Sequence, residues 1–202
     1  MGKFFCIGRN KTGTTSLLKA FEDLGFRGGK QWDGEGLLPY WEKKNWQPIL
    51  EYCGTADVFQ DIPFSYDETF IHLEQHFPNA KFILSIRNDA NQWYDSLIRF
   101  HGKRFGRIPP TLEDVKKLPY RGNGWIYWSM QKLYKTPLDD PYNKEILTKH
   151  YNDYNQSVLH YFEDKPNKLL VINLDEEGSY QKFCEFIGVK SPFTKFPHLN
   201  KS

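Results

Sequence analysis

The stretch KFFCIGRNKTGTTSLLKAF, close to the start of the chain, limits the possible folds more than any other part of the sequence. An apolar run ends at Gly8, a polar loop containing Gly13 follows, and Leu17, Leu18 and Phe21 then recur at helical spacing. This order predicts a buried strand, a loop and a helix, which together gather backbone N–H groups and the positive end of the helix around an anion. We therefore expect a phosphate or sulfate site here; the alternative is a polar turn that only caps the helix.

The loop departs from the pattern G-x-x-x-x-G-K-[ST] that binds nucleoside triphosphates. Both glycines and Thr15 fit, but position 14 is a threonine and the nearest lysine is Lys11, inside the loop. In a triphosphate loop the lysine reaches the β- and γ-phosphates while the adjacent hydroxyl holds magnesium. The displaced lysine therefore counts against a magnesium-dependent small-molecule kinase. That enzyme remains an alternative, with Asp61 or Asp175 as its magnesium carboxylate.

Short apolar segments and amphipathic segments alternate along the rest of the chain. Further strands are expected at 56–61, 80–87 and 168–174, and helices at about 67–77, 93–105, 144–162 and 180–187. Strands joined through helices need crossover connections, so we expect an α/β fold in three layers, with a mainly parallel central sheet and helices on both faces. Its ligands should lie at the carboxyl ends of the strands. Residues 1–202 are expected to form one domain, in which 106–142 is an insertion or lid.

Composition sets limits on partners and location. Lys and Arg number 27 against 25 Asp and Glu, so the net charge of +2 gives no general reason to expect a nucleic-acid partner. The three cysteines are far apart, so neither a zinc site nor a disulfide framework is indicated, and a reduced, intracellular setting fits better. No run of about 18 apolar residues exists, and the first residues are too short for a signal peptide. We expect a cytoplasmic protein without a membrane span.

The segment KTGTTSL resembles the 5′-phosphosulfate loop of the sulfotransferases, whose core is Lys-[ST]-Gly-Thr-[ST]. In that family the loop binds 3′-phosphoadenosine 5′-phosphosulfate, and the fold is of the P-loop type. The resemblance implies the same donor here, with adenosine 3′,5′-bisphosphate as its product and no metal. The donor-binding residues implied for this loop are Arg9, Asn10, Lys11, Thr12, Gly13, Thr14, Thr15 and Ser16.

A second motif, FILSIRNDANQWYDSL, resembles the 3′-phosphate clamp of the same family. There an arginine at the end of a buried strand and a serine early in the next helix hold the phosphate, which implies Arg87 and Ser96 here. The two are nine residues apart, where many members have eight. The alternative for Arg87 is a salt bridge at the end of a strand.

The segment SPFTKFPHLNKS resembles the terminal segment that closes over the nucleotide, with contacts through Lys195, His198 and Asn200. It is equally compatible with a solvated tail.

Sulfuryl transfer needs a cation on the leaving oxygen and a base on the acceptor. Lys11 is the predicted cation. Asp61 is the first candidate for the base because it follows an apolar strand and precedes Pro63, which should bring it to the same sheet edge as the loop. Its alternative role is to cap a turn. His101, in a basic stretch from Arg99 to Arg107, is the second candidate, and its alternative is a solvated helix end.

The function that follows is transfer of a sulfuryl group, in line, from 3′-phosphoadenosine 5′-phosphosulfate to a hydroxyl or amine of a small-molecule or carbohydrate acceptor. Two alternatives remain beside it: the magnesium-dependent kinase, and a non-catalytic nucleotide-binding module. The segments that should select the acceptor, 27–54 and 106–142, contain no motif. The aromatic run WIYWSM, residues 125–130, is compatible with an acceptor wall, an adenine cover or simple packing.

Overall fold

The computed structural model describes residues 2–117 and 120–199. Within these residues the chain forms two compact units. One is built from the described parts of 1–87 and 155–201, and the other from those of 88–154. The second unit therefore extends beyond 106–142 on both sides.

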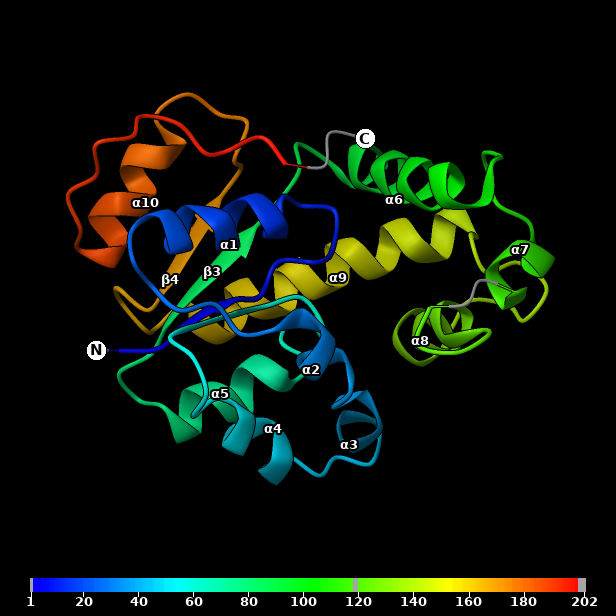
Figure 1. The fold of residues 1–202 in the computed structure, drawn as a ribbon, viewed down its shortest axis with the longest axis horizontal. Coiled ribbons are helices and arrows are strands. Elements are labelled where there is room, and N and C mark those ends of the chain that lie inside the picture. Colours follow the sequence, from blue (N-terminus) through cyan, green and yellow to red (C-terminus); the bar gives the residue numbers. More distant parts are fainter. Residues whose placement is uncertain (1, 118–119, 200–202) are drawn as a thin grey trace. The chain divides into compact units, whose positions relative to one another are not determined.

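The first unit contains a sheet of four strands that all run parallel, in the order β2-β1-β3-β4 (Figure 1). Register pairs Cys6 with Gln60 on one side and with Ile83 on the other, so the strands end at a common edge. The strands are β1 (Phe4–Cys6), β2 (Val58–Gln60), β3 (Lys81–Ser85) and β4 (Leu169–Ile172), and the helices of this unit are α1 (Thr14–Asp23), α2 (Gln31–Glu35), α3 (Leu38–Glu42), α4 (Gln47–Tyr52), α5 (Thr69–His76) and α10 (Ser179–Ile187).

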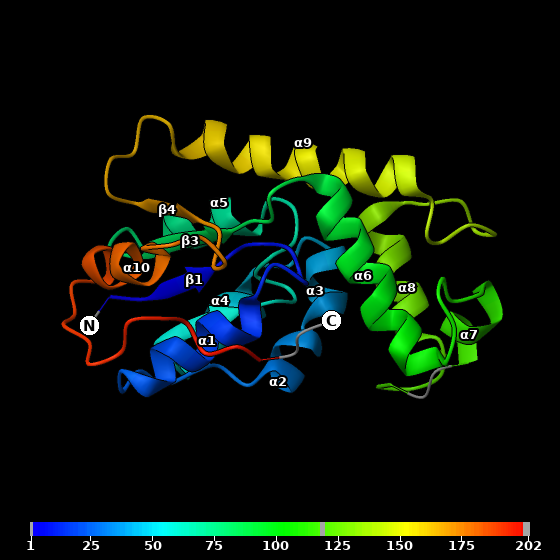
Figure 2. The ribbon, with the colours of Figure 1, turned by 90° about the horizontal axis from the view of Figure 1, so that it is seen from above.

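Alternate residues of β1 pack on opposite faces of the sheet, as expected for a strand. Phe4 and Cys6 lie in one apolar cluster with residues of α1 and α10. Phe5 points to the other face, where its ring stacks against Phe59 and Phe82. The carboxyl end of helix α9 (Lys144–Phe162) belongs to this unit and brings the Phe162 ring to 4.9 Å from that of Phe82. Figure 2 shows α9 and α1 on opposite sides of the sheet.

The second unit is helical. It comprises α6 (Ala90–Phe105), α7 (Leu112–Lys117), α8 (Trp125–Tyr134) and the first part of α9. Its centre is the buried indole of Trp93, which stacks on Tyr151 at a ring distance of 4.8 Å. Asp89 caps α6 by accepting a hydrogen bond from the Gln92 backbone N–H, and Gly106, at φ 78°, ends the helix before the two prolines are reached.

The three-layer α/β fold with a parallel sheet is confirmed, and so are all four predicted strands. The helix predicted at 144–162 is also confirmed, and the segment 124–134 contributes α8. The segment 27–54 forms three short helices, α2, α3 and α4, that its sequence did not indicate. Each is five or six residues long, too short for helical periodicity to show. In the described residues no helix is long and apolar enough to span a membrane.

Gly8 is the residue on which the junction of β1 and β3 depends. A Cβ added to Gly8 would lie 2.8 Å from the Ser85 backbone nitrogen and closer still to the Ser85 carbonyl and hydroxyl oxygens. Backbone atoms cannot rotate away, so only glycine fits.

We expect Gly8→Ala to lower the free energy of unfolding by roughly 1–3 kcal/mol, the range for an over-packed core position, because β1 and β3 must separate. Urea unfolding followed by circular dichroism measures this loss. Gly54→Ala is the control, because its nearest neighbour would be 3.1 Å away and its φ is not positive; it should cost less than about 1 kcal/mol. Equal losses for the two variants would contradict the assignment.

Candidate active site

The loop between β1 and α1 is pinned to the neighbouring strand. The Thr12 hydroxyl lies 2.6 Å from the Ser85 hydroxyl and donates to the Arg9 carbonyl oxygen, also at 2.6 Å. Gly13 precedes α1 with φ 93°, a left-handed conformation that favours glycine, and its α-carbon faces Leu174 closely. The first turn of α1 carries the hydroxyls of Thr14, Thr15 and Ser16. The loop and the start of the helix are thus held in one conformation.

Arg87, predicted from the second motif, follows β3 and reaches back to this loop. Its Nε donates to the Lys11 carbonyl oxygen at 2.9 Å, and its Nη1 forms an ion pair with Asp175 at 2.7 Å. Its side chain is 20% exposed. The structure therefore places Arg87 next to Lys11, and it also shows the strand-end salt bridge that was the alternative for this residue. The salt bridge is thus confirmed, whereas the phosphate-binding role of Arg87 stays a prediction.

Arg9 has a different environment from the one its place in the loop suggests. Its guanidinium is buried and donates to the Ser65 carbonyl oxygen and to the Asp67 carboxylate. The side chain thus joins the loop to the segment after β2. Any contribution of Arg9 to donor binding would have to come from its backbone, because its side chain is committed elsewhere.

Lys11 and Asp61 occupy the same edge of the sheet, as predicted. Asp61 directly follows β2, and the positive charge of Lys11 acts to lower the pKa of its carboxyl group. Both residues have left-handed backbone conformations, with φ 68° for Lys11 and 61° for Asp61. Such conformations cost about 1–3 kcal/mol each and often occur at functional sites.

A second carboxylate lies beside Asp61. Glu35, on α2, is 3% exposed, and the Gln31 side-chain amide donates both to Glu35 Oε1 at 2.9 Å and to Asp61 Oδ2 at 3.3 Å. The Gln60 amide in turn donates to Gln31 Oε1 at 3.3 Å. Burial, and next the negative charge of Glu35, raise the pKa of Asp61 to about 6, despite the opposing effect of Lys11.

The segment after α10 returns to the loop. Phe196 is buried and packs its ring edge-on against Tyr180, at 5.0 Å between centroids. Further on, the Leu199 backbone N–H donates to the Ser16 hydroxyl oxygen at 3.1 Å. The Ser16 hydroxyl oxygen thus accepts this hydrogen bond through one lone pair, and the hydroxyl hydrogen can still be donated. Lys195 and His198 lie on this segment, while Asn200 lies outside the described residues.

Ser96 and His101 both lie on α6, in the second unit. Ser96 is buried, and so is His101, whose Nδ1 lies 2.7 Å from the Tyr142 hydroxyl. His101 thus has a partner within its own unit. The donor role of Ser96 and the catalytic role of His101 stay predictions.

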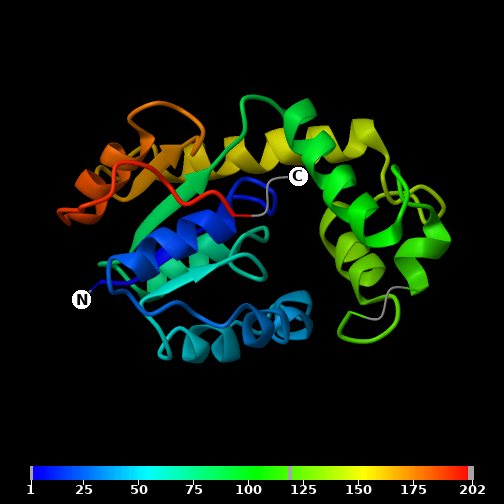
Figure 3. The same ribbon diagram turned by 45° about the horizontal axis from the view of Figure 1, so that its top comes forward.

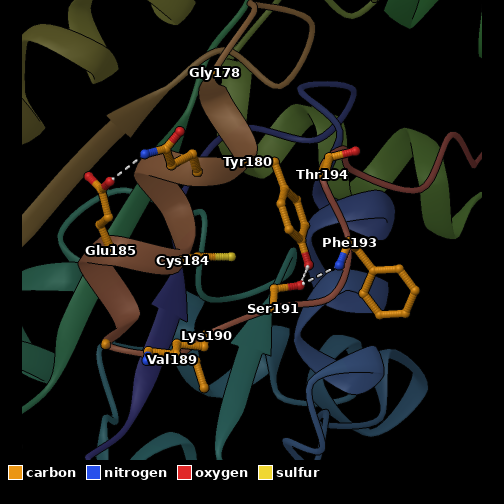
Figure 4. A pocket seen from close by; sticks show the side chains of 11 residues that line it. Gly178, Tyr180, Cys184, Glu185, Val189, Lys190, Ser191, Phe193 and Thr194 are labelled. Atoms are coloured by element: carbon orange, nitrogen blue, oxygen red, sulfur yellow. Dashed lines mark hydrogen bonds between the residues drawn. The ribbon is translucent and has the colours of Figure 1, made fainter.

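A pocket of about 640 Å³ lies between α10 and residues 189–194 (Figure 4). On one side the Tyr180 and Ser191 hydroxyls lie 2.8 Å apart, and Ser191 also accepts from the Phe193 backbone N–H at 3.0 Å. None of its lining residues is among those predicted to bind the donor.

Sequence reasoning missed Gln31 and Glu35, the partners of Asp61. Their i, i+4 spacing is the one signal that QWDGE carries, and it becomes meaningful only when α2 is known to be a helix. The sequence suggests Asp175 only as a magnesium ligand of the kinase alternative, whereas the structure pairs it with Arg87.

Comparison with known proteins gives one family. The family model described as "Sulfotransferase domain" matches residues 3–202. A search of curated proteins finds no match. The family match spans the phosphosulfate-like loop, the strand that ends before Arg87 and both compact units. The chain therefore belongs to the sulfotransferase family and is a sulfotransferase.

Proposed function

We propose that this sulfotransferase takes its sulfuryl group from 3′-phosphoadenosine 5′-phosphosulfate and transfers it in line to a hydroxyl or amine acceptor at the carboxyl edge of the sheet. The observation that carries the proposal is the convergence of Lys11, Asp61 and Arg87 on one loop and one sheet edge. These residues come from the segments after β1, β2 and β3. A cation, a base and an anion clamp are the three elements that such a transfer needs.

The residues around the loop fit the phosphosulfate group. Gly13, at φ 93° just before α1, gives the loop a turn in which backbone N–H groups can surround an anion. The hydroxyls of Thr14, Thr15 and Ser16, at the positive end of α1, supply donors for phosphate oxygens. When bound, the donor supplies an activated sulfate whose leaving group is a phosphate. Arg87 is the side chain for the second phosphate, and it would share its guanidinium with Asp175.

Lys11 and Asp61 divide the work of the transfer. The sulfur–oxygen bond to the leaving phosphate breaks as a sulfur–oxygen or sulfur–nitrogen bond to the acceptor forms. The Lys11 ammonium stabilises the negative charge that develops on the leaving oxygen. The Asp61 carboxylate accepts the proton that the acceptor loses, and its pKa of about 6 suits a base that works near neutral pH. Gln31 donates a hydrogen bond to Asp61 and is itself held by Glu35.

The kinase alternative receives no support. The family match covers the segment in which position 14 is a threonine. Asp175, one of its two proposed magnesium carboxylates, is paired with Arg87.

Donor binding is tested by thermal unfolding with adenosine 3′,5′-bisphosphate and, separately, with magnesium ATP. At about 100 times its dissociation constant the bisphosphate should stabilise the protein by about 2.7 kcal/mol. Arg87→Ala should reduce this stabilisation. Stabilisation by magnesium ATP and none by the bisphosphate would refute the proposed donor.

Lys11→Ala should lower the turnover number by roughly 10²–10³-fold, the usual cost of one transition-state donor, while the fold is kept. Release of the bisphosphate from the donor measures turnover, and circular dichroism checks the fold. The matched control is Lys19→Ala, since Lys19 lies on α1 and pairs with Asp23. If Lys11→Ala turned over as fast as the control, another residue would have to stabilise the leaving oxygen.

The rate should depend on the ionisation of Asp61. A base must be deprotonated, so kcat/KM should rise with pH up to about 6 and then level off. Glu35→Gln removes the like charge that raises the pKa of Asp61, so its profile should level off at a lower pH. Measurement from pH 4.5 to 8 shows the shift.

Glu42→Gln is the control for this profile, because Glu42 is an exposed carboxylate on α3. Its profile should match that of the unaltered enzyme. An unchanged profile in Glu35→Gln would contradict the proposal that the charge of Glu35 raises the pKa of the base. Loss of turnover at every pH in Glu35→Gln would contradict a role for Glu35 that is limited to this pKa.

A further inference from the structure

We propose that the acceptor is a neutral carbohydrate, whose ring packs on the exposed indole of Trp32 while one of its hydroxyls reaches Asp61. This inference rests on the proposed function and names its acceptor class. The observation behind it is a juxtaposition: Trp32 is 56% exposed, and it lies on the same short helix as Gln31 and Glu35, which hold Asp61.

Close contacts fix helix α2 over the end of β2. A Cβ added to Gly34 would lie 2.9 Å from the Ile62 carbonyl oxygen, and one added to Gly29 would lie 2.6 Å from the Phe59 ring. The Gly29 backbone N–H also donates to the Val58 carbonyl oxygen at 2.8 Å. The helix thus cannot move away from Asp61 without losing these contacts. Figure 3 shows this part of the chain at the end of the sheet toward which the strands point.

Helix geometry then places the indole. Gln31 and Glu35 are four residues apart and share the face of α2 that meets Asp61. Trp32 is three residues before Glu35, so it flanks this face on the solvent side. An exposed indole provides a flat contact surface with little conformational entropy to lose.

Apart from Lys11, which the proposed function assigns to the leaving oxygen and whose charge also acts on Asp61, the polar groups at Asp61 have hydrogen-bond acceptors left for a ligand. The Gln31 amide already donates to Glu35 and to Asp61, and its oxygen already accepts from Gln60. Carboxylates can only accept once ionised. An acceptor hydroxyl bound at Asp61 must therefore donate a hydrogen bond to it, and the charges of Asp61 and Glu35 disfavour an anionic group at this position.

A sugar ring combines the two required properties. Its C–H face is flat and apolar, which suits the Trp32 indole, and its edge carries several hydroxyl donors, which suit Asp61. A phenol brings a single hydroxyl, and an alkylamine has no flat face. A protonated amine would be attracted to the carboxylates, but in that form it has no lone pair with which to attack sulfur.

The test is calorimetric titration of the bisphosphate-loaded protein with maltose, lactose, cellobiose, 4-nitrophenol and butylamine, followed by turnover with each. We expect saturable binding of at least one disaccharide, and sulfate transfer to it. Trp32→Ala should weaken its binding about tenfold, which corresponds to ~1.4 kcal/mol, and Trp32→Phe should weaken it less because a flat ring remains. The affinity for the bisphosphate should not change in either variant.

Leu159→Ala is the control, because Leu159 is an exposed apolar side chain, 38% exposed, on α9, away from the proposed site and from the pocket beside α10. It should bind the disaccharide as the unaltered protein does. Binding and transfer restricted to 4-nitrophenol or butylamine would overturn the inference, as would no saturable binding of any disaccharide or an unchanged affinity in Trp32→Ala. In each of these cases bisphosphate binding would still support the proposed function, whose own failure would appear as a loss of that binding in the unaltered protein.

Discussion

The contact between Gly8 and Ser85 is the constraint on which the rest of the site depends. Because no side chain stands between β1 and β3 at this point, the loop after β1 lies directly against the end of β3. The Thr12 hydroxyl then reaches Ser85, and the Arg87 guanidinium, two residues further on, reaches the Lys11 carbonyl oxygen. One close approach between two strands thereby sets the positions of the predicted cation and of the predicted phosphate clamp.

Charge is balanced locally at this edge. Arg9 and Arg87 each pair with an aspartate, whereas Asp61 shares an amide with a second carboxylate. The arginines hold segments together, because each also donates to a backbone carbonyl. Asp61 and Glu35, by contrast, are two like charges kept close together. The charge of Glu35 adds to burial in raising the pKa of Asp61. The unmatched charge at this edge thus lies at the proposed base.

How much the sequence predicts depends on how far apart the interacting residues lie. The strand, loop and helix around Gly8 and Gly13 were predictable because they follow one another within 20 residues, whereas the donor-binding role of the loop stays a proposal. A salt bridge of Arg87 was among the alternatives, but its partner Asp175, 88 residues away, was not predictable. Neither was the role of Glu35, because QWDGE shows no periodicity and depends on a helix of five residues folding over β2. Short helices held by tertiary contacts leave little trace in a sequence.

The strand order has a consequence for how such a site can vary. From β1 the chain passes over one face to β2, at one edge of the sheet, and then returns under the other face to β3, on the far side of β1. The sheet therefore reverses its direction of growth beside the loop, a point at which open α/β sheets commonly bind nucleotides. The donor half of the proposed site belongs to this switch point, whereas Asp61, Glu35 and Trp32 belong to the β2 edge. A lineage can therefore change residues of 27–54 other than Gln31 and Glu35 for a new acceptor without touching the donor half of the proposed site.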